Sequence, residues 1–337
     1  MNSLQRIGAA INFAASDRVP VIAQVFGHAA VMEHVPLGDY LKNGEILAHC
    51  QLKALDRYGY DAVFALMDTG VETEAAGSRL YYQKDDYPYV EQYVLAGADE
   101  VKRLAVPDPQ SSGRMPEILK AAKMLRRETG DGTLVVGCVM GPMTLAIQLL
   151  GAEKALFLAA DEPEAFNRVL DYAAEVAIVF GLAQIDAGAH LPVVFDPSAS
   201  PAVIPSGFFR EFELPRLTRV FAAFKEKGAM ANWLHIAGPA ETIYPYYPEA
   251  GVDIANADYC VDPLRARQTL PRTCFDGNIR PLSFVTATAN EIAAESARLI
   301  DLFSPEGGFI LSSGCEIPPE SRPENVAAMI SATRSEV

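Results

Sequence analysis

The chain lacks the long apolar runs, basic clusters and paired cysteines that mark several large classes of protein. No apolar run approaches the length of a membrane span, and residues 1–20 lack the basic and then apolar pattern of a signal peptide. Lysine and arginine number 28 against 43 acidic residues and form no cluster, so a nucleic-acid partner is not expected. The five cysteines are odd in number and widely spaced, which is no disulfide framework. We therefore expect a cytoplasmic protein with no membrane partner.

A glycine-rich phosphate loop is also missing after the first apolar segment, which argues against a doubly wound nucleotide-binding sheet. The sequence instead alternates strand-like segments with longer helical patterns. The strand-like segments are continuously apolar, as in strands that are buried on both faces. They cover residues 19–25, 61–67, 133–139, 191–196, 229–234, 252–257, 272–277 and 308–313. We expect one α/β domain over residues 1–337, a (β/α)8 TIM barrel with an N-terminal helical extension and a hairpin or loop insertion at 72–112.

Polar side chains follow most of these strand-like segments. In a (β/α)8 barrel the carboxyl ends of the strands form one rim, and the chemistry of such barrels takes place there. His235 and Cys315 lie 80 positions apart, and each comes directly after a strand-like segment. If they converge at the rim, their nitrogen and sulfur suit a zinc site with an open position. The alternative is that both are ordinary rim residues that fill a cleft.

Other strand ends offer candidates for catalysis and for substrate binding. Asp68 and Asp196 are candidate catalytic residues as acid or base, although a single aspartate often caps a helix instead. Asn278, a third catalytic candidate, could hydrogen-bond a substrate oxygen, and Arg280 could bind a carboxylate or phenolate. The segment that holds both could equally be a simple turn. His28 follows the first strand and is a further candidate for substrate binding.

The chain resembles the uroporphyrinogen decarboxylase superfamily, and within it the corrinoid-dependent methyltransferase branch typified by methylcobalamin:coenzyme M methyltransferase. The resemblance covers nearly the whole length. It includes YGYDAVFALMDTGVETEAAG and GPMTLAIQLLG, and it continues through LHIAGPAETI, FDGNIRP and GGFILSSGCEIPPESRPENV. The last three motifs are the ones most specific to the methyltransferase branch. The resemblance implies a (β/α)8 barrel, in agreement with the strand pattern.

The resemblance also implies a zinc site, with one departure. Thiol-methylating members hold zinc with a histidine, a cysteine two residues later and a more distant cysteine. The matching positions here are His235, Ala237 and Cys315, so the middle cysteine is missing. A zinc ion would need a third ligand, for which the candidates are Asp258 and Cys260. Glu72 and Asp196 are weaker candidates, and Glu72 could instead bind substrate.

Replacing one thiolate by a carboxylate or water would make the zinc a harder Lewis acid, which suits an ether or alcohol oxygen. We therefore expect a methyltransferase that takes a methyl group from a small methylated or methoxylated compound, with O-demethylation favoured. None of the five histidines lies in the Asp-x-His-x-x-Gly pattern of a cobalamin-binding loop. The corrinoid is therefore expected on a separate partner protein.

Three other functions remain open. The first is decarboxylation of uroporphyrinogen, although no Arg or Lys lies between Arg18 and Lys42, near the first strand end, to neutralise its carboxylates. The second is methyl transfer from a methylcorrinoid to a thiol such as coenzyme M. The third is a non-catalytic protein that binds a corrinoid or tetrapyrrole. An oligomer is compatible with each of them.

Overall fold

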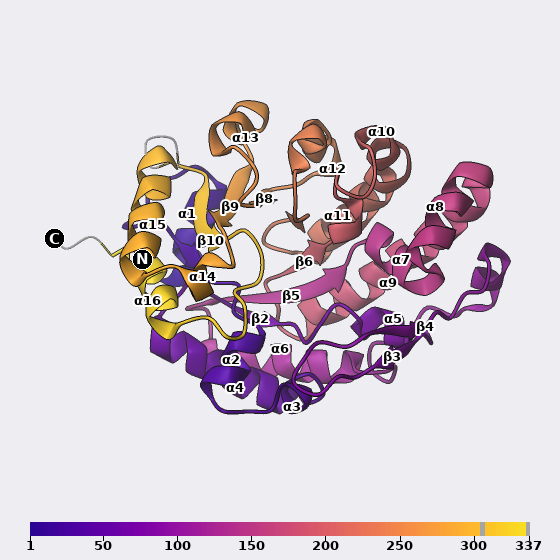
Figure 1. The fold of residues 1–337 in the computed structure, drawn as a ribbon, viewed down its shortest axis with the longest axis horizontal. Coiled ribbons are helices and arrows are strands. Elements are labelled where there is room, and N and C mark those ends of the chain that lie inside the picture. The colour runs from indigo at the N-terminus through magenta and orange to yellow at the C-terminus, as the bar shows by residue number, and fades with distance from the viewer. Residues whose placement is uncertain (304–306, 335–337) are drawn as a thin grey trace.

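The computed structural model describes residues 1–303 and 307–334, and its centre is a sheet of eight parallel strands (Figure 1). Neighbouring strands pair in the order β1-β10-β9-β8-β7-β6-β5-β2. Their bounds are β1 Val21–Ile22, β2 Ala62–Ala65, β5 Leu134–Met140, β6 Leu191–Phe195, β7 Trp233–His235, β8 Ile254–Ala257, β9 Cys274–Ile279 and β10 Phe309–Ser313. The expected α/β barrel is confirmed.

Helices connect the strands and surround them (Figure 1). They are α1 Ser3–Ile11, α2 Gly27–Met32, α3 Leu37–Tyr40, α4 Gly44–Tyr58, α5 Val71–Ala75, α6 Met115–Thr129, α7 Pro142–Leu150, α8 Ala152–Asp161, α9 Pro163–Asp186, α10 Ser206–Phe208, α11 Leu214–Lys227, α12 Tyr247–Ala250, α13 Pro263–Thr269, α14 Ser283–Thr286, α15 Ala289–Phe303 and α16 Pro323–Ser331. Local signals fix several ends. Asn43 caps α4 by accepting from two backbone N–H groups, and Gly59 ends it in the left-handed conformation.

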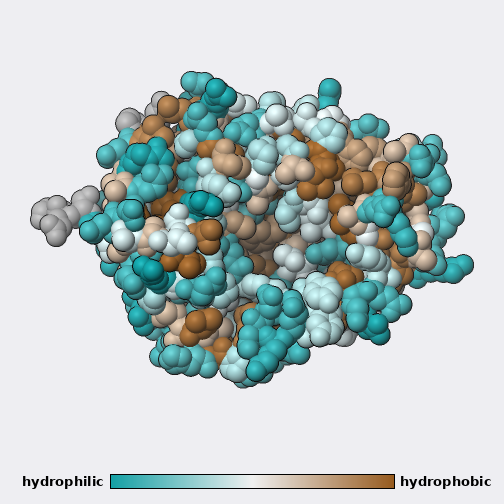
Figure 2. All heavy atoms as spheres, viewed as in Figure 1, coloured by the Kyte–Doolittle hydropathy of each residue, from teal (hydrophilic) through white to brown (hydrophobic). Residues whose placement is uncertain are grey.

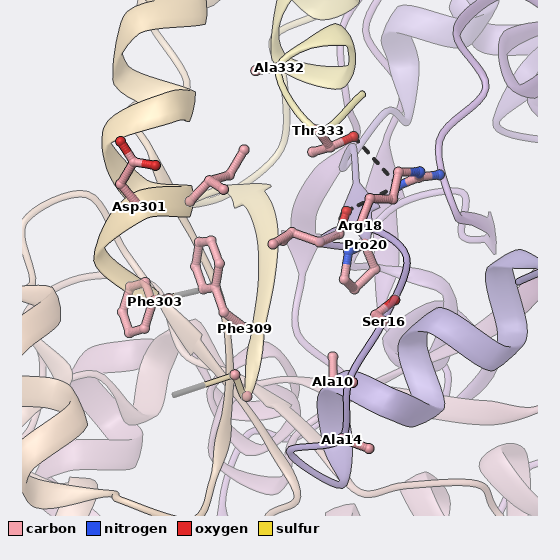
Figure 3. Close-up of a pocket in the computed structure, with 15 residues that line it drawn as sticks. Ala10, Ala14, Ser16, Arg18, Pro20, Asp301, Phe303, Phe309, Ala332 and Thr333 are labelled. Atoms are coloured by element: carbon pink, nitrogen blue, oxygen red, sulfur yellow. Dashed lines mark hydrogen bonds between the residues drawn. The ribbon is translucent and has the colours of Figure 1, made fainter. Parts of the chain in front are cut away.

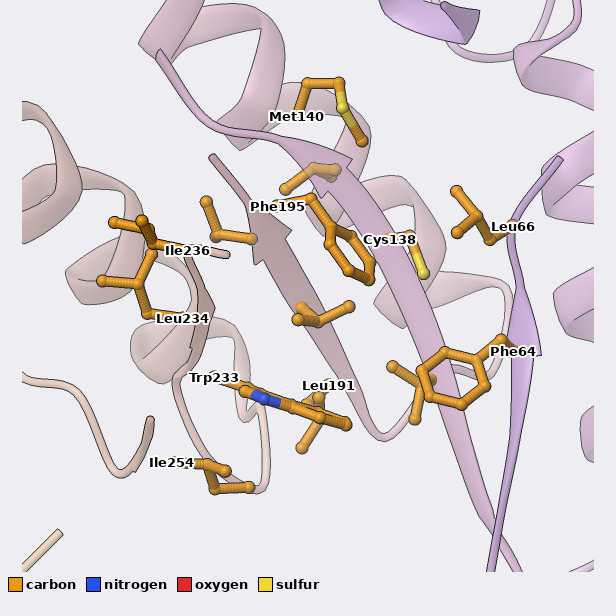
Figure 4. Close-up of a cluster of buried hydrophobic side chains, with 14 of the residues drawn as sticks. Phe64, Leu66, Cys138, Met140, Leu191, Phe195, Trp233, Leu234, Ile236 and Ile254 are labelled. Carbon is orange, nitrogen blue, oxygen red and sulfur yellow. The ribbon is translucent and has the colours of Figure 1, made fainter. Parts of the chain in front are cut away.

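The strands are buried along their whole length, and their side chains pack into one apolar core. Figure 4 shows part of it, in which Phe64 of β2, Phe195 of β6 and Trp233 of β7 face one another inside the barrel. Trp233 is 1% exposed, and its indole N–H donates to Asp276 at 2.8 Å. Buried Trp needs such a partner, because an unpaired N–H in an apolar core is costly. This part of the barrel interior is therefore packed with side chains.

The barrel closes between β1 and β2, which form no strand ladder with each other. The backbone N–H of Asp61 donates to Val21 O at 2.8 Å, and the Asp61 carboxylate accepts from Val21 N at 2.8 Å. The same carboxylate pairs with both terminal nitrogens of Arg18, at 2.7 and 2.8 Å. Asp61 is fully buried. One charged side chain thus joins the two ends of the sheet.

The insertion at 72–112 contains an antiparallel hairpin, β3 Arg79–Tyr81 with β4 Tyr89–Gln92, as expected. Strand β7 covers Trp233–His235. It begins later than the segment 229–234 expected from the sequence, and His235 is its last residue. No single helix in the described part of the chain is long and apolar enough to cross a membrane, although the bent pair α7 and α8 meets those criteria when its parts are combined.

Candidate active site at the strand ends

A cavity of about 230 Å³ opens at the carboxyl ends of the strands. Figure 2 shows a hollow near the middle of the viewed face, with hydrophobic side chains at its bottom. The cavity wall is mostly apolar and includes no Lys or Arg. The lining residues are Phe26, Leu66, Met67, Asp68, Thr69, Tyr87, Phe195, Pro197, His235, Ala237, Cys315 and Glu316. Because active sites of (β/α)8 enzymes lie at this end of the barrel, we take this cavity as the candidate site.

A larger cavity, of about 520 Å³, lies at the other end of the barrel (Figure 3). Its walls come from residues that precede β1 and β10 and from the end of the chain after α16. Arg18 on its wall pairs with Asp61 and with Thr333, which are the contacts of barrel closure. At the amino ends of the strands, such residues serve stability rather than chemistry.

His235 and Cys315 both line the smaller cavity, although β7 and β10 are not neighbouring strands. His235 is 2% exposed, and neither ring nitrogen has a hydrogen-bond partner among the described residues. Burial lowers the pKa of His235 to about 3 and raises that of the Cys315 thiol to about 11. Both side chains are therefore uncharged at neutral pH, and the imidazole keeps one free donor and one free acceptor.

The donor set for a metal is incomplete. The two unpartnered nitrogens of His235 and the sulfur of Cys315 are suitable ligands, but Ala237 on the same wall offers none. Within residues 1–303 and 307–334, no three His, Cys, Asp or Glu side chains are grouped so that they could hold a metal ion. Catalytic zinc normally takes three protein ligands. The side chains in this arrangement therefore do not fit the zinc site of the thiol-methylating relatives.

The two expected suppliers of a third ligand lie outside the cavity wall. The Asp258 carboxylate accepts from the backbone N–H of Gly238 and of Tyr259, each at 2.5 Å. These contacts tie the loop after β8 to the loop after β7. Cys260 is exposed.

Asp68 lines the cavity but is held by Arg114, which precedes α6. The guanidinium makes two hydrogen bonds to the two carboxylate oxygens of Asp68, and its Nε donates to Glu74 at 2.6 Å. Gly70 N also donates to Asp68 Oδ1, at 2.8 Å. The negative charge of Asp68 is thus balanced from outside the cavity. Arg114 precedes a helix and does not follow a strand, so the sequence analysis did not identify it.

Glu316 and Tyr87 are two further residues of the cavity that the sequence analysis did not select. Tyr87 lies in the hairpin of the insertion, and its hydroxyl donates to Glu316 Oε1 at 2.5 Å. Burial raises the pKa of Glu316 to about 7. Position 316 directly follows Cys315, so the strand-end rule could have identified Glu316. Tyr87 could not be identified in this way, because it comes from a distant loop.

Asp196 and Glu72 are buried next to the barrel end but are not on the cavity wall. Asp196 accepts from the backbone N–H of Met143 and Thr144 and from the Thr144 hydroxyl, at 3.3, 2.8 and 2.6 Å, which anchors the start of α7. Burial raises the pKa of Asp196 and of its neighbour Glu213. Glu72 accepts from Met140 N at 2.8 Å, and burial raises its pKa to about 7.

The remaining predicted residues lie elsewhere. His28 is 1% exposed, and its ring nitrogens contact Pro319 O at 3.0 Å and the Tyr58 hydroxyl at 2.9 Å. Asn278 donates to two backbone carbonyls of the loop after β8, at 3.1 and 3.2 Å. It lines a third cavity, of about 270 Å³, together with Arg280, whose guanidinium lies 5.4 Å from the ring of Tyr259. The structure does not bring these three residues to the cavity of His235.

An eight-stranded parallel barrel with a cavity at the carboxyl ends of its strands is the architecture of (β/α)8 enzymes. A family model described as uroporphyrinogen decarboxylase (URO-D) matches residues 2–336. The chain therefore belongs to the uroporphyrinogen decarboxylase family, which confirms the resemblance read from the sequence motifs.

Both decarboxylases and methyltransferases are similar to this chain. A uroporphyrinogen decarboxylase of Syntrophotalea carbinolica is 29% identical over 307 residues, which cover 89% of this chain and 87% of the relative. A methylcobamide:CoM methyltransferase of Methanosarcina barkeri is 28% identical over 233 residues, 68% of this chain and 66% of the relative. A solved structure, a methyltransferase from Methanosarcina mazei, matches with a TM-score of 0.90 at 25% identity and covers 99% of this chain and 98% of its own.

Proposed function

We propose that the protein is a corrinoid-linked methyltransferase that moves a methyl group between a small, uncharged methylated compound and a separate corrinoid protein. A methyl ether is the favoured substrate, so the reaction is an O-demethylation. One observation carries the proposal: His235 and Cys315 line a single small cavity whose wall includes no Lys or Arg. The similarity to methyltransferases over most of the chain supports it.

The corrinoid of the partner protein would supply the cobalt nucleophile that takes the methyl group. The residues of this chain bind and orient the ether. Apolar walls from Phe26, Leu66 and Phe195 pack against it and exclude water. When the carbon–oxygen bond breaks, its electron pair remains on the oxygen. The neutral ring of His235 offers a free N–H that can stabilise this developing charge by a hydrogen bond.

The zinc ion expected from the sequence remains a prediction, and metal analysis of the purified protein would test it. It would supply a Lewis acid for the ether oxygen. Because the described residues include no group of three His, Cys, Asp or Glu side chains that could hold a metal ion, and catalytic zinc usually takes three protein ligands, the proposed chemistry uses the protein's own groups.

Charge and size disfavour the other candidate functions. Uroporphyrinogen is a tetrapyrrole with many carboxylates, whereas the cavity measures about 230 Å³ and has no cation on its wall. The sulfonate of coenzyme M also requires a cationic partner, and Arg114, which lies behind Asp68, is already paired with Asp68 and Glu74. In a binding protein without activity, the two unpartnered ring nitrogens of the buried His235 would have no role.

The test is a screen of methyl donors with a reduced corrinoid protein, followed by the absorbance change as cobalt(I) becomes methylcobalt(III). We expect turnover with at least one uncharged aryl or alkyl methyl ether and none with methylated carboxylates or sulfonates. Uroporphyrinogen is incubated in parallel, and its products are separated by chromatography. Loss of carboxylates from uroporphyrinogen, or turnover only of anionic donors, would overturn the proposal.

A further inference from the structure

Glu316 has one oxygen that is fixed and one that is free. Its Oε1 accepts from the hydroxyl of Tyr87 at 2.5 Å and from the backbone N–H of Gly27 at 3.3 Å. No hydrogen bond or ion pair to Oε2 is found within the described residues, although the side chain is on the cavity wall. Glu316 is therefore held in one orientation by groups behind it and presents an unused polar atom to the ligand space.

Tyr87 is itself held tightly against the rim. Its hydroxyl accepts from Gly27 N at 3.0 Å, and a Cβ at position 27 would lie only 2.7 Å from that oxygen, so the close approach needs glycine. The same hairpin is anchored at Tyr82, whose hydroxyl donates to Glu74 at 2.8 Å and whose ring lies 4.1 Å from the Lys42 ammonium. The insertion thus brings Tyr87 to the cavity on the loop that connects β3 and β4, and the contacts of Tyr82 and of Tyr87 itself hold this loop against the rim.

We propose that Glu316, positioned by Tyr87, is a specificity-determining residue whose free oxygen hydrogen-bonds a hydroxyl group of the uncharged substrate. This inference rests on the proposed function and names its substrate more closely, as a methyl ether that also carries a hydroxyl. The geometry explains why a hydroxyl fits. Since Oε1 accepts from two donors, any proton of Glu316 is on Oε2, and a hydroxyl can donate to an ionised Oε2 or accept from a protonated one.

A second ether oxygen in the same place could accept from a protonated Oε2 but could not donate to an ionised one, whereas a hydroxyl can pair with either form, and an anionic group would meet the carboxylate. A polar group of the site that is left unpaired by the wrong ligand produces strong discrimination. His235 and Glu316 then divide the work, since His235 contacts the ether oxygen that loses its methyl group and Glu316 contacts the hydroxyl.

Calorimetric titration without any corrinoid tests this inference, with 2-methoxyphenol and 1,2-dimethoxybenzene as the two probes. We expect the wild type to prefer 2-methoxyphenol by about 10- to 100-fold in Kd. Glu316→Met, which is close in size but apolar, should bring the ratio of the two Kd values near one. In Glu316→Gln the carbonyl oxygen takes the place of Oε1, because two donors point to it. An NH2 donor then faces the ligand, and the preference should also fall, since this donor serves a hydroxyl and a methoxy oxygen alike. Tyr87→Phe should give an intermediate ratio, because Glu316 loses its main contact.

Circular dichroism and thermal unfolding of each variant control for folding. Equal binding of the two probes by the wild type, binding of neither at millimolar concentration, or an unchanged preference in Glu316→Met would overturn the inference. Failure of this inference can be distinguished from failure of the proposed function. A preference for 2-methoxyphenol without methyl transfer from any ether would contradict the methyltransferase proposal and leave the binding assignment standing, whereas methyl transfer without the preference would do the reverse.

Discussion

His235 and Cys315 share a cavity wall although β8 and β9 separate the strands that carry them. Such residues meet only because the sheet curves into a barrel, so that side chains from opposite strands converge above the packed interior. Burial then decides their charge. With the pKa of His235 lowered to about 3 and that of Cys315 raised to about 11, these two side chains stay uncharged across the physiological range. The wall also carries the carboxyl groups of Asp68 and Glu316 and no Lys or Arg, so it disfavours anionic ligands.

The effect of burial on a pKa can be tested at a single residue, Glu72. Its carboxyl is 2% exposed, and desolvation raises its pKa to about 7 from a model-peptide value near 4.5. A raised pKa stabilises the fold below the unfolded-state pKa, and this contribution disappears as the pH rises through 7. Glu72→Gln keeps an acceptor for Met140 N but cannot ionise. The free energy of unfolding of the variant should therefore rise relative to wild type by about 2–3 kcal/mol between about pH 5 and about pH 8.

Urea denaturation of Glu72→Gln and wild type at several pH values measures this difference. The other buried groups titrate in both proteins, so their effects cancel in the comparison. A difference that does not change with pH would show that Glu72 does not ionise over this range.

The sequence predicts the residues of the site where the strand-end rule applies, and it fails where side chains come from elsewhere. His235, Cys315 and Asp68 follow strands and do line the cavity. Tyr87 reaches it from the hairpin, and Arg114 pairs with Asp68 from a loop before α6; no periodicity reveals such long-range contacts. Position alone also cannot tell in which direction a strand-end side chain points.

The residues that lie elsewhere show the second difficulty. Asn278, at the end of β9, donates both of its hydrogen bonds to the backbone of the loop after β8. Asp258 is likewise used by backbone N–H groups. Each side chain hydrogen-bonds backbone groups of the rim loops, and the sequence does not reveal which backbone groups need such a partner.

At the scale of the element, Asp196 caps the amino end of α7 from outside the helix, because the N-cap residue of α7 has no side chain that could do so. The residue before α7, Gly141, has no side chain to accept from the first N–H groups, and a Cβ there would lie 2.2 Å from Asp196 Oδ2. The carboxylate from β6 occupies this space and accepts from Met143 N and Thr144 N instead. A negative charge at a helix amino end is also favourable.

Asp196→Ala should therefore lower the free energy of unfolding by about 2–4 kcal/mol, because it leaves three buried donors without a partner. Asp196→Asn keeps one carbonyl oxygen at the helix end and should cost less than half as much. Equal losses for the two variants in urea denaturation would mean that the capping hydrogen bonds do not explain the role of Asp196.

Element boundaries are predicted less well than element types. Continuous apolar segments locate all eight strands, yet β7 begins at Trp233 rather than at residue 229. The residues before it serve the turn after α11, where Gly228 adopts a φ of 99° and Ala229 N bonds back to Phe224 O. This turn follows from the end of the helix, which hydrophobicity alone does not locate.

At the scale of the whole molecule, barrel closure depends on Asp61. Its carboxylate joins Val21 N and Arg18 across the seam between β1 and β2. Asp61→Ala should lower the free energy of unfolding by about 3–5 kcal/mol, because a part-buried guanidinium and a buried N–H lose their partner. Asp17→Ala is the control. Asp17 also pairs with an arginine, Arg6, but the Asp17 carboxylate is exposed and Arg6 keeps a contact with Asp61 at 3.4 Å, so the loss of Asp17 should cost about 1 kcal/mol or less.

Chemical denaturation of the two variants side by side measures the contribution of the seam. If Asp61→Ala unfolds no more easily than Asp17→Ala, the seam is held by the strands themselves and not by this ion pair.

Methyl transfer by cavity variants tests the central claim most directly. Single-turnover formation of methylcobalt(III) from the ether found in the screen is timed for wild type, His235→Ala, Cys315→Ala and the exposed control His49→Ala. We expect the rate to fall by about 100-fold or more in His235→Ala, since its hydrogen bond acts on the developing charge. Cys315→Ala should also be slower, and His49→Ala should remain within about twofold of wild type. A folded His235→Ala that transfers the methyl group at the wild-type rate would contradict the account.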